Sequence, residues 1–321
     1  MGGLTRCATA AVIAALAGSG TVAATPYPSQ PIRLIVPLAA GGPADHVART
    51  IAPALAKALE QPVVVENRAG ADGVLGAQAA LAAAPDGHTL LLAGGGLVAA
   101  PLLRKPAPFA MTDFVPVSKI SSAVWALFVA ADVPARSVSE LIALARAKPG
   151  GIAYASSTTV DFLAASRFMN ATATRLVKVP YKGVAQALPD LAAGRVQVNF
   201  SPLSTAVLAQ VSSGRLRPLA VLAPRRSALL PEVPTMIESG IPDLAVPGWL
   251  ALFAPPRTAA HIVARLHREL GAVLQDPMVR AQLERQSMEP DGSGPAALAA
   301  TLAHDAVLWQ QFIREHLIAA D

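Results

Sequence analysis

The feature that most constrains the fold of this 321-residue chain is a regular alternation of strand-like and helix-like segments. Ile32–Val36 is an apolar run typical of a buried strand, and residues 45–59 carry apolar side chains at fourfold spacing, which predicts a helix. An alanine-rich helical segment at 74–84 separates two further strand-like runs at 62–65 and 89–93. This βαβαβ order indicates an α/β fold with a parallel sheet covered by helices.

The same alternation then restarts in the second half of the chain. Ser137 is a predicted helix N-cap, with Glu140 three residues on as the partner of a capping box. The tail from Thr258 reads as helices. Strands are expected at 125–131, 152–156, 176–179, 196–200, 219–223 and 249–254, and helices at 137–148, 161–170, 185–193 and 205–212.

Two α/β units followed by a helical tail predict a first domain that is interrupted by a second. The first domain would comprise residues 25–127 plus 247–321, and the second would comprise residues 128–246. A chain that crosses twice between domains forms a hinge about which the two halves can close over a ligand. The alternative is one continuous α/β domain.

The N-terminus has the features of a secretory signal peptide. Arg6 gives a positive start, residues 8–18 are apolar, and Val22, Ala23 and Ala24 are small residues of the kind found at a cleavage site. The apolar stretch is too short to span a bilayer. We therefore expect residues 1–24 to be removed near Ala24 and the mature protein to be periplasmic, with an uncleaved anchor as the alternative.

Composition excludes several classes of protein. The single cysteine, Cys7, lies within the expected signal peptide, which excludes disulfides, thiolate metal sites and cysteine nucleophiles from the mature chain. Aromatic residues make up 4% and the basic residues are scattered, so no nucleic-acid partner is expected. No metal and no cofactor are expected either, because common catalytic motifs are missing and the six histidines show no metal-ligand spacing.

One candidate binding site is the bare turn LAAGGPAD, in which Leu38, Ala39, Ala40, Gly41 and Gly42 follow the first strand. Ligands of open α/β sheets bind beyond the carboxyl ends of the strands. With few side chains in the way, the backbone N–H groups could approach an anion, aided by the N-terminal field of the next helix. Asp45 is expected to cap that helix. The alternative is an ordinary strand–helix turn.

Comparable turns follow other predicted strands. Taken singly, each could be an ordinary turn or cap, and Lys182 could be a solvated surface lysine. Taken together, they could line a cleft from both halves with hydroxyl and backbone donors. The candidate residues in these turns are Ala93, Gly94, Ser156, Ser157, Thr158, Tyr181, Lys182, Gly183 and Ser201.

Several motifs in one order resemble a known family. They include YPSQPIRLIVPLAAGGPADHVAR, QPVVVENRAGADG, KPGGIAYASS, VPYKGVAQALPDLAAGRVQVNF and WLALFAPPRT. Over nearly all of the mature chain the sequence is similar to the Bug-type receptors, the periplasmic substrate-binding proteins of tripartite tricarboxylate transporters. The resemblance implies a two-domain clamshell of the periplasmic-binding-protein type (Venus flytrap, type II-like). It also implies that a ligand carboxylate is held by backbone amides and hydroxyls of residues 39–42 and of Ser156 and Ser157.

The chain departs from the family pattern in two turns. The loop after Ser157 is about two residues shorter than usual, lacks glycine and contains Asp161. This acid could repel a second carboxylate, receive a ligand amine, or cap the following helix. The turn at residues 93–96 is Ala-Gly-Gly-Gly where a serine–asparagine pair is common.

These observations predict a monomeric, non-catalytic receptor. It would capture a small carboxylate or amino-acid solute and deliver it to the membrane permease subunits of a tripartite transporter. One alternative is a receptor that signals through a membrane sensor protein. A more distant alternative is a small α/β hydrolase using Ser156 or Ser201, neither of which has a recognisable general base in the sequence.

Overall fold

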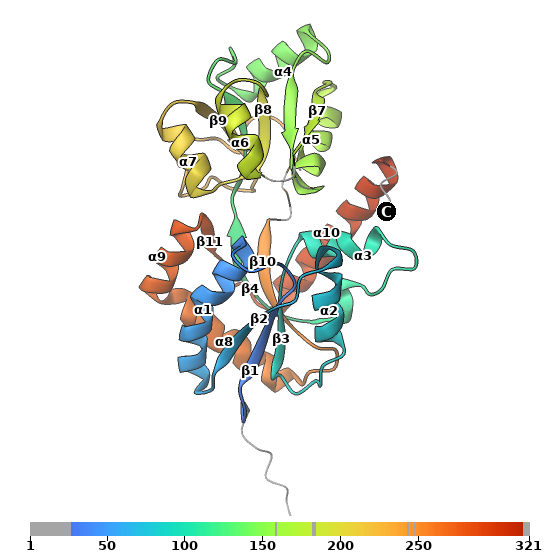
Figure 1. The fold of residues 1–321 in the computed structure, drawn as a ribbon, viewed down its shortest axis with the longest axis vertical. Helices are drawn as coiled ribbons and strands as arrows, with labels where there is room; N and C mark the ends of the chain where they lie inside the picture. The colour runs from blue at the N-terminus through green and yellow to red at the C-terminus, as the bar shows by residue number, and fades with distance from the viewer. Residues whose placement is uncertain are drawn as a thin grey trace, which may run out of the picture.

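The computed structural model describes residues 27–157, 159–181, 184–242, 244, 246 and 248–316, which form two lobes stacked one above the other (Figure 1). The predicted signal peptide at 1–24 lies outside the described residues. Each lobe is built on its own mixed β-sheet with helices around it. The predicted α/β class is therefore confirmed.

The first lobe contains a six-stranded sheet in the order β11-β4-β10-β3-β1-β2. β1 is parallel to both of its neighbours, whereas β10 runs antiparallel to β3 and β4. The strands are β1 (Ile32–Val36), β2 (Val63–Asn67), β3 (Thr89–Gly94), β4 (Val115–Ala123), β10 (Trp249–Ala254) and β11 (Met288–Pro290). The helices are α1 (Pro43–Leu59), α2 (Val74–Leu81), α3 (Gly96–Leu102), α8 (Ala260–Gln275), α9 (Pro277–Arg285) and α10 (Pro295–His316), with short 3-10 turns at Ala71–Gly73 and Met111–Asp113.

The second lobe repeats this plan with a five-stranded sheet in the order β7-β6-β8-β5-β9. β6 is parallel to its two neighbours, and β5 runs antiparallel to β8 and β9. The strands are β5 (Trp125–Ala130), β6 (Ala153–Ser156), β7 (Val177–Pro180), β8 (Val198–Pro202) and β9 (Leu216–Val221). The helices are α4 (Val138–Ala147), α5 (Thr159–Thr172), α6 (Val184–Ala192) and α7 (Thr205–Ser212).

In each sheet, the strand that enters from the other lobe runs antiparallel to both of its neighbours, and in the first sheet the short edge strand β11 also runs antiparallel to β4. β5 follows β4 directly after Val124, and β10 begins after the chain returns from the second lobe. The two crossings lie side by side, because the N–H of Ala123 donates to the C=O of Gly248 at 2.5 Å. By sheet membership the second unit starts at Trp125, slightly before the predicted boundary at 128. The domain boundaries themselves stay a prediction.

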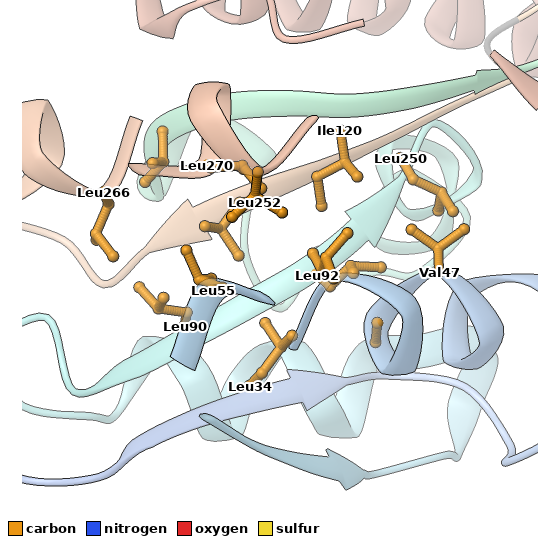
Figure 2. Close-up of a cluster of buried hydrophobic side chains, with 14 of the residues drawn as sticks. Leu34, Val47, Leu55, Leu90, Leu92, Ile120, Leu250, Leu252, Leu266 and Leu270 are labelled. Atoms are coloured by element: carbon orange, nitrogen blue, oxygen red, sulfur yellow. The ribbon is translucent and has the colours of Figure 1, made fainter. Parts of the chain in front are cut away.

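Alternating side chains on the first sheet supply two separate cores, as the two-residue period of a strand requires. Leu90 and Leu92 pack with α1 and α8 on one face, as Figure 2 shows, and the same cluster includes residues of α9. Leu91 and Ala93, from the same strand, pack with α2, α3 and α10 on the other face. Both faces of the sheet are therefore covered, which explains why its strands read as nearly continuous apolar runs.

The second sheet is also covered on both faces. Leu127 and Val129 of β5 pack in a cluster with residues of α4 and α5, and Ala126 and Phe128 of the same strand pack with residues of α6 and α7. The predicted cap of α4 is confirmed, since the Ser137 Oγ accepts the Glu140 N–H at 3.2 Å. A capping box would also have the Glu140 carboxylate accept the N–H of the cap residue, Ser137. Here it accepts the N–H of Arg136, one residue earlier.

Two strands and one helix are additional to those predicted. β4 contains Pro116, Lys119 and buried serines, and α3 contains Gly96 and Pro101, so neither shows a clear apolar period. β11 is only three residues long.

Across the part of the chain that the structure describes, none of the helices combines the length and apolar character needed to cross a membrane.

Candidate functional site

The first candidate loop joins β1 to α1 at the carboxyl end of the sheet. Asp45 does not cap α1 as predicted, because the helix already begins at Pro43. The residue before the helix is Gly42, which has extended backbone and no side-chain cap. Asp45 lies inside the first turn, 3% exposed, and its Oδ2 accepts the Gly41 N–H at 2.8 Å. The Gly41 N–H is therefore engaged within the loop and is not available to a ligand in this arrangement.

A charged network fixes the conformation of this loop. The Asp45 carboxylate accepts from the Arg49 Nε at 3.0 Å, and Arg49 also donates to the Asn67 Oδ1 at 3.1 Å. The Asn67 Nδ2 donates in turn to the C=O of Leu38 at 3.2 Å. The hydrogen bond from Arg49, followed by that from Gly41, lowers the pKa of Asp45 from 3.8 to about 2. Among the described residues, the N–H groups of Ala39 and Ala40 have no acceptor and stay available as donors.

Acid is expected to weaken the folded state through Asp45. The pKa of Asp45 is lower in the folded protein, so its contribution is present above pH 4 and is lost as the pH falls through about 2. We expect Asp45→Asn to cost about 1–2 kcal/mol at pH 7, since the partner Arg49 is half exposed. Urea unfolding of the wild type and the variant should be measured between pH 7 and pH 2. The difference between their free energies of unfolding should become smaller below pH 4. A difference that stays constant over this pH range would contradict the stabilising role of the ionised Asp45 side chain.

The second candidate loop joins β6 to α5 in the other lobe. The Oδ2 of Asp161 accepts the Ser157 N–H at 2.6 Å, and its Oδ1 accepts the N–H of Phe162 at 2.9 Å. Asp161 is 1% exposed. Like Asp45, Asp161 lies inside the first turn of its helix, because α5 already begins at Thr159, and of the three roles considered for this acid the structure supports a local one, in which the carboxylate accepts backbone N–H groups at the start of α5. Burial, with the charge of Asp161 as the second cause, raises the pKa of Tyr154 below the loop to about 12.

The two loops share one construction. In each lobe, an aspartate in the first turn of the helix accepts the backbone N–H of the residue four positions earlier, at the end of the strand–helix loop. The aspartates are Asp45 in α1 and Asp161 in α5, and both are buried. A carboxylate that accepts backbone N–H groups holds its loop in one conformation before any ligand arrives. Both loops are therefore preorganised.

A cavity of about 530 Å³ lies between the two loops. Its first-lobe lining comes from Pro37 and Leu38, the Asp72–Gly73 turn, the end of β3, α3, and single residues of α1 and β10. The second lobe contributes Ser157 and Val160, and α10 contributes Trp309. The volume falls in the range of small-molecule sites.

The structure brings part of the predicted site together. The predicted residues that line the cavity are Leu38, Ala93, Gly94 and Ser157. Ala39, Ala40, Gly41, Gly42 and Asp45 belong to the loop beside it but are not part of the lining. Ser156 and Ser201 are buried in strands β6 and β8, away from the lining. Thr158, Lys182 and Gly183 lie outside the described residues.

Tyr181 also lies outside the lining, and its contacts are internal to its lobe. Its hydroxyl donates to the Asp190 Oδ2 at 2.8 Å, and its N–H donates to the C=O of Ser156 at 2.8 Å. Burial, followed by the hydrogen bond to Asp190, raises the pKa of Tyr181. In this structure Tyr181 supports the position of β6 relative to β7.

Several lining residues were not predicted. Asp72 and Gly73 belong to the VENRAGADG motif, whose glycine-rich turn was a usable signal. Leu97 and Val160 lie on helices next to predicted turns, and Trp309 comes from the C-terminal helix. Nothing in the local sequence around Trp309 distinguishes a cavity residue from a core residue.

The cavity offers no cationic side chain to an anion. In the described part of the chain, its lining includes no lysine or arginine, and its one ionisable residue is Asp72. The Asp72 carboxylate is 3.3 Å from Arg104, whose guanidinium also donates to the backbone of Ala71 and Ala100. A negative charge here would have to be met by backbone N–H groups, hydroxyls and helix dipoles. Among the described residues, no group of three or more His, Cys, Asp or Glu side chains could hold a metal ion.

Comparison with known proteins places these features in context. The model of the tripartite tricarboxylate transporter family receptor matches residues 47–316. Protein BugT of Bordetella pertussis is 36% identical over 302 residues, covering 92% of this chain and 91% of that protein. A TctC solute binding protein from Polaromonas superposes with a TM-score of 0.83 at 28% identity, covering 90% of this chain and 99% of the other. A Rhodopseudomonas palustris protein solved with adipate has a TM-score of 0.74 at 30% identity, covering 91% and 99%.

Proposed function

The chain belongs to the tripartite tricarboxylate transporter receptor family, and on that premise we propose that it captures a small carboxylate in the periplasm and delivers it to a membrane permease. The family is one of solute-binding receptors and not of enzymes. The similar protein from Rhodopseudomonas palustris was solved with adipate, which supports a carboxylate as ligand class. The predicted signal peptide at 1–24 supports export.

One observation carries the proposal: a preorganised loop from each lobe borders the same cavity. Each loop is fixed by its own buried aspartate, so the donors of the first-lobe loop and of Ser157 are held in place before binding. Backbone N–H groups at the ends of strands and the starts of helices are suited to a carboxylate. A ligand that contacts both loops would favour closure about the two adjacent crossings, near Ala123 and Gly248.

Thermal unfolding of the mature protein against a panel of acids tests this function. Residues 25–321 would be unfolded and refolded to remove any bound solute, then melted with mono-, di- and tricarboxylates, amino acids and aromatic acids. A ligand present at 100 times its dissociation constant adds about 2.7 kcal/mol to the stability of the folded state, which gives a clear rise in midpoint. Uncharged amides of the same acids serve as controls. No rise with any acid would contradict the proposal.

Transport, rather than signalling, is the role that we propose for the captured solute. The permease subunits of a tripartite transporter are the expected partners, and the receptor is expected to act as a monomer. Deleting the chromosomal copy should abolish uptake of the radiolabelled ligand found in the panel, and the wild-type gene should restore it. Normal uptake combined with loss of a transcriptional response to the ligand would favour a sensor protein as partner.

A further inference from the structure

Beyond the two loops, the cavity is built mainly from apolar side chains. Leu97 and Leu103 come from α3 and the residue after it, Val160 comes from α5, and Trp309 comes from α10. The side chain of Asp72, the one ionisable lining residue of the described chain, is 76% exposed. The cavity therefore combines a polar end, at the loops, with an apolar body.

Trp309 differs from the neighbouring buried tryptophan in how its indole N–H is used. The Trp249 Nε1 donates to the Asp305 Oδ2 at 2.7 Å, one helical turn before Trp309 on α10. Trp309 is 0% exposed, and its Nε1 has no hydrogen-bond partner among the described residues. An unpaired buried donor is costly, so it calls for an explanation. The hydroxyl of Ser157, on the opposite lobe, is likewise without a partner in the described chain.

Trp309 also lies where the two lobes meet. Its ring centroid is 5.9 Å from that of Phe312, which is 5.3 Å from the ring of Phe162 on α5. Leu163 of α5 belongs to the same buried cluster as Trp309. Figure 1 shows α10 running from the first lobe toward the side of the second. Trp309 therefore borders the cavity at the junction of the two lobes.

We propose, building on the carboxylate-receptor function, that the ligand is a monocarboxylate with an apolar body and one neutral hydrogen-bond acceptor at its far end. The carboxylate binds at the Ala39–Ala40 and Ser157 loops, and the body packs against Leu97 and Val160. The acceptor receives the indole N–H of Trp309. A second carboxylate is disfavoured, because it would lie in the apolar body of the cavity, where the described lining has no cation to pair with it.

Two sets of three matched acids test the ligand class by calorimetry on the refolded mature protein. The five-carbon set is levulinate, valerate and glutarate, and the aromatic set is para-acetylbenzoate, para-isopropylbenzoate and terephthalate. In the set whose size suits the cavity, we expect the keto acid to bind about 5- to 10-fold more tightly than its hydrocarbon analogue. The diacid should bind most weakly.

The variant Trp309→Phe isolates the donor, because it removes the N–H and keeps an aromatic ring. It should weaken keto-acid binding about 5- to 10-fold, to the level of the hydrocarbon acid, and leave the hydrocarbon acid unchanged. Trp249→Phe is the matched control, since its N–H is already bonded to Asp305. This control should lower the unfolding midpoint without changing the ratio of the two affinities. Circular dichroism would confirm that both variants fold. If one variant does not fold, the order of the wild-type affinities for the keto acid, the hydrocarbon acid and the diacid still tests the ligand class.

The possible failures are distinguishable. A diacid that binds as tightly as the keto acid, or a keto-acid preference that survives Trp309→Phe, would overturn the monocarboxylate assignment and leave the carboxylate receptor intact. The monocarboxylate assignment also fails, and the carboxylate receptor stays intact, if none of the six matched acids binds while other acids of the wider panel do. If no carboxylate of any kind binds, the proposed function itself fails.

Discussion

Gly41→Val is expected to remove most of the carboxylate affinity while leaving the protein folded. Gly41 has φ +80°, and a Cβ placed there would meet no atom within 4 Å, so the effect comes from backbone strain and not from a clash. A β-branched residue strongly disfavours this conformation, at a cost of about 1–3 kcal/mol. Relaxing the strain would break the hydrogen bond from Gly41 to Asp45 and move the N–H groups of Ala39 and Ala40. We expect the affinity to fall on the order of 100-fold.

Gly214→Val is a closely matched control for this experiment. Gly214 has φ +72°, and a Cβ at this position would also meet no atom within 4 Å, but Gly214 follows α7 and is not part of the cavity lining. Both variants should therefore lose similar stability in urea unfolding, while only Gly41→Val loses affinity in calorimetry. Equal affinities for Gly41→Val and wild type would mean that the β1–α1 loop does not contact the ligand.

Asp161→Ala is expected to have the second large effect, on both stability and binding. The substitution leaves the N–H groups of Ser157 and Phe162 without their carboxylate acceptor in a buried position. We expect a loss of about 2–4 kcal/mol in the free energy of unfolding. Because Ser157 would no longer be held, affinity for carboxylates should fall at least about tenfold.

Asp276→Ala separates the loss of a cap from the loss of the site. Asp276 accepts the N–H groups of Met278 and Val279 at the start of α9, away from the cavity lining. This control should lower stability without changing affinity. If Asp161 instead received a ligand amine, Asp161→Ala would weaken amino acids and spare simple carboxylates. Unchanged affinity for every acid would contradict a role for the β6–α5 loop.

Apolar patterning predicted most of the elements, because buried strands and amphipathic helices have different periods. β4 was missed because Ser118 and Ser121 replace apolar residues at fully buried positions. The Ser118 Oγ donates to the C=O of Ser293, which lies far along the chain. A local pattern cannot show that a distant carbonyl will satisfy a buried hydroxyl. α3 was missed for a similar reason, since it is stabilised by packing with α2 and α10 and not by propensity.

The candidate site was predictable where it depends on the ends of strands. Leu38 follows β1, and Ala93 and Gly94 end β3, which is parallel to β1 in the same sheet; Ser157 follows the parallel strand β6 of the other sheet. Carboxyl ends of parallel strands share one edge, so strand order alone brings Leu38, Ala93 and Gly94 together, whereas the position of Ser157 beside them depends on how the two lobes pack. The role of Asp45 was less predictable, because α1 begins at Pro43, two residues before the predicted start at 45, and this places Asp45 inside the first turn, where it supports Gly41.

By itself, the amino-acid sequence determined the α/β class, the strand–helix turns and the receptor family, since these depend on local periods and on motifs in a fixed order. The tertiary structure alone decided that Trp309 lines the cavity and that its N–H differs from that of Trp249. Both tryptophans are buried and apolar in context, so local chemistry is the same for each. What separates them is a partner from a distant segment, Asp305 for Trp249, and this is known only after the chain has packed.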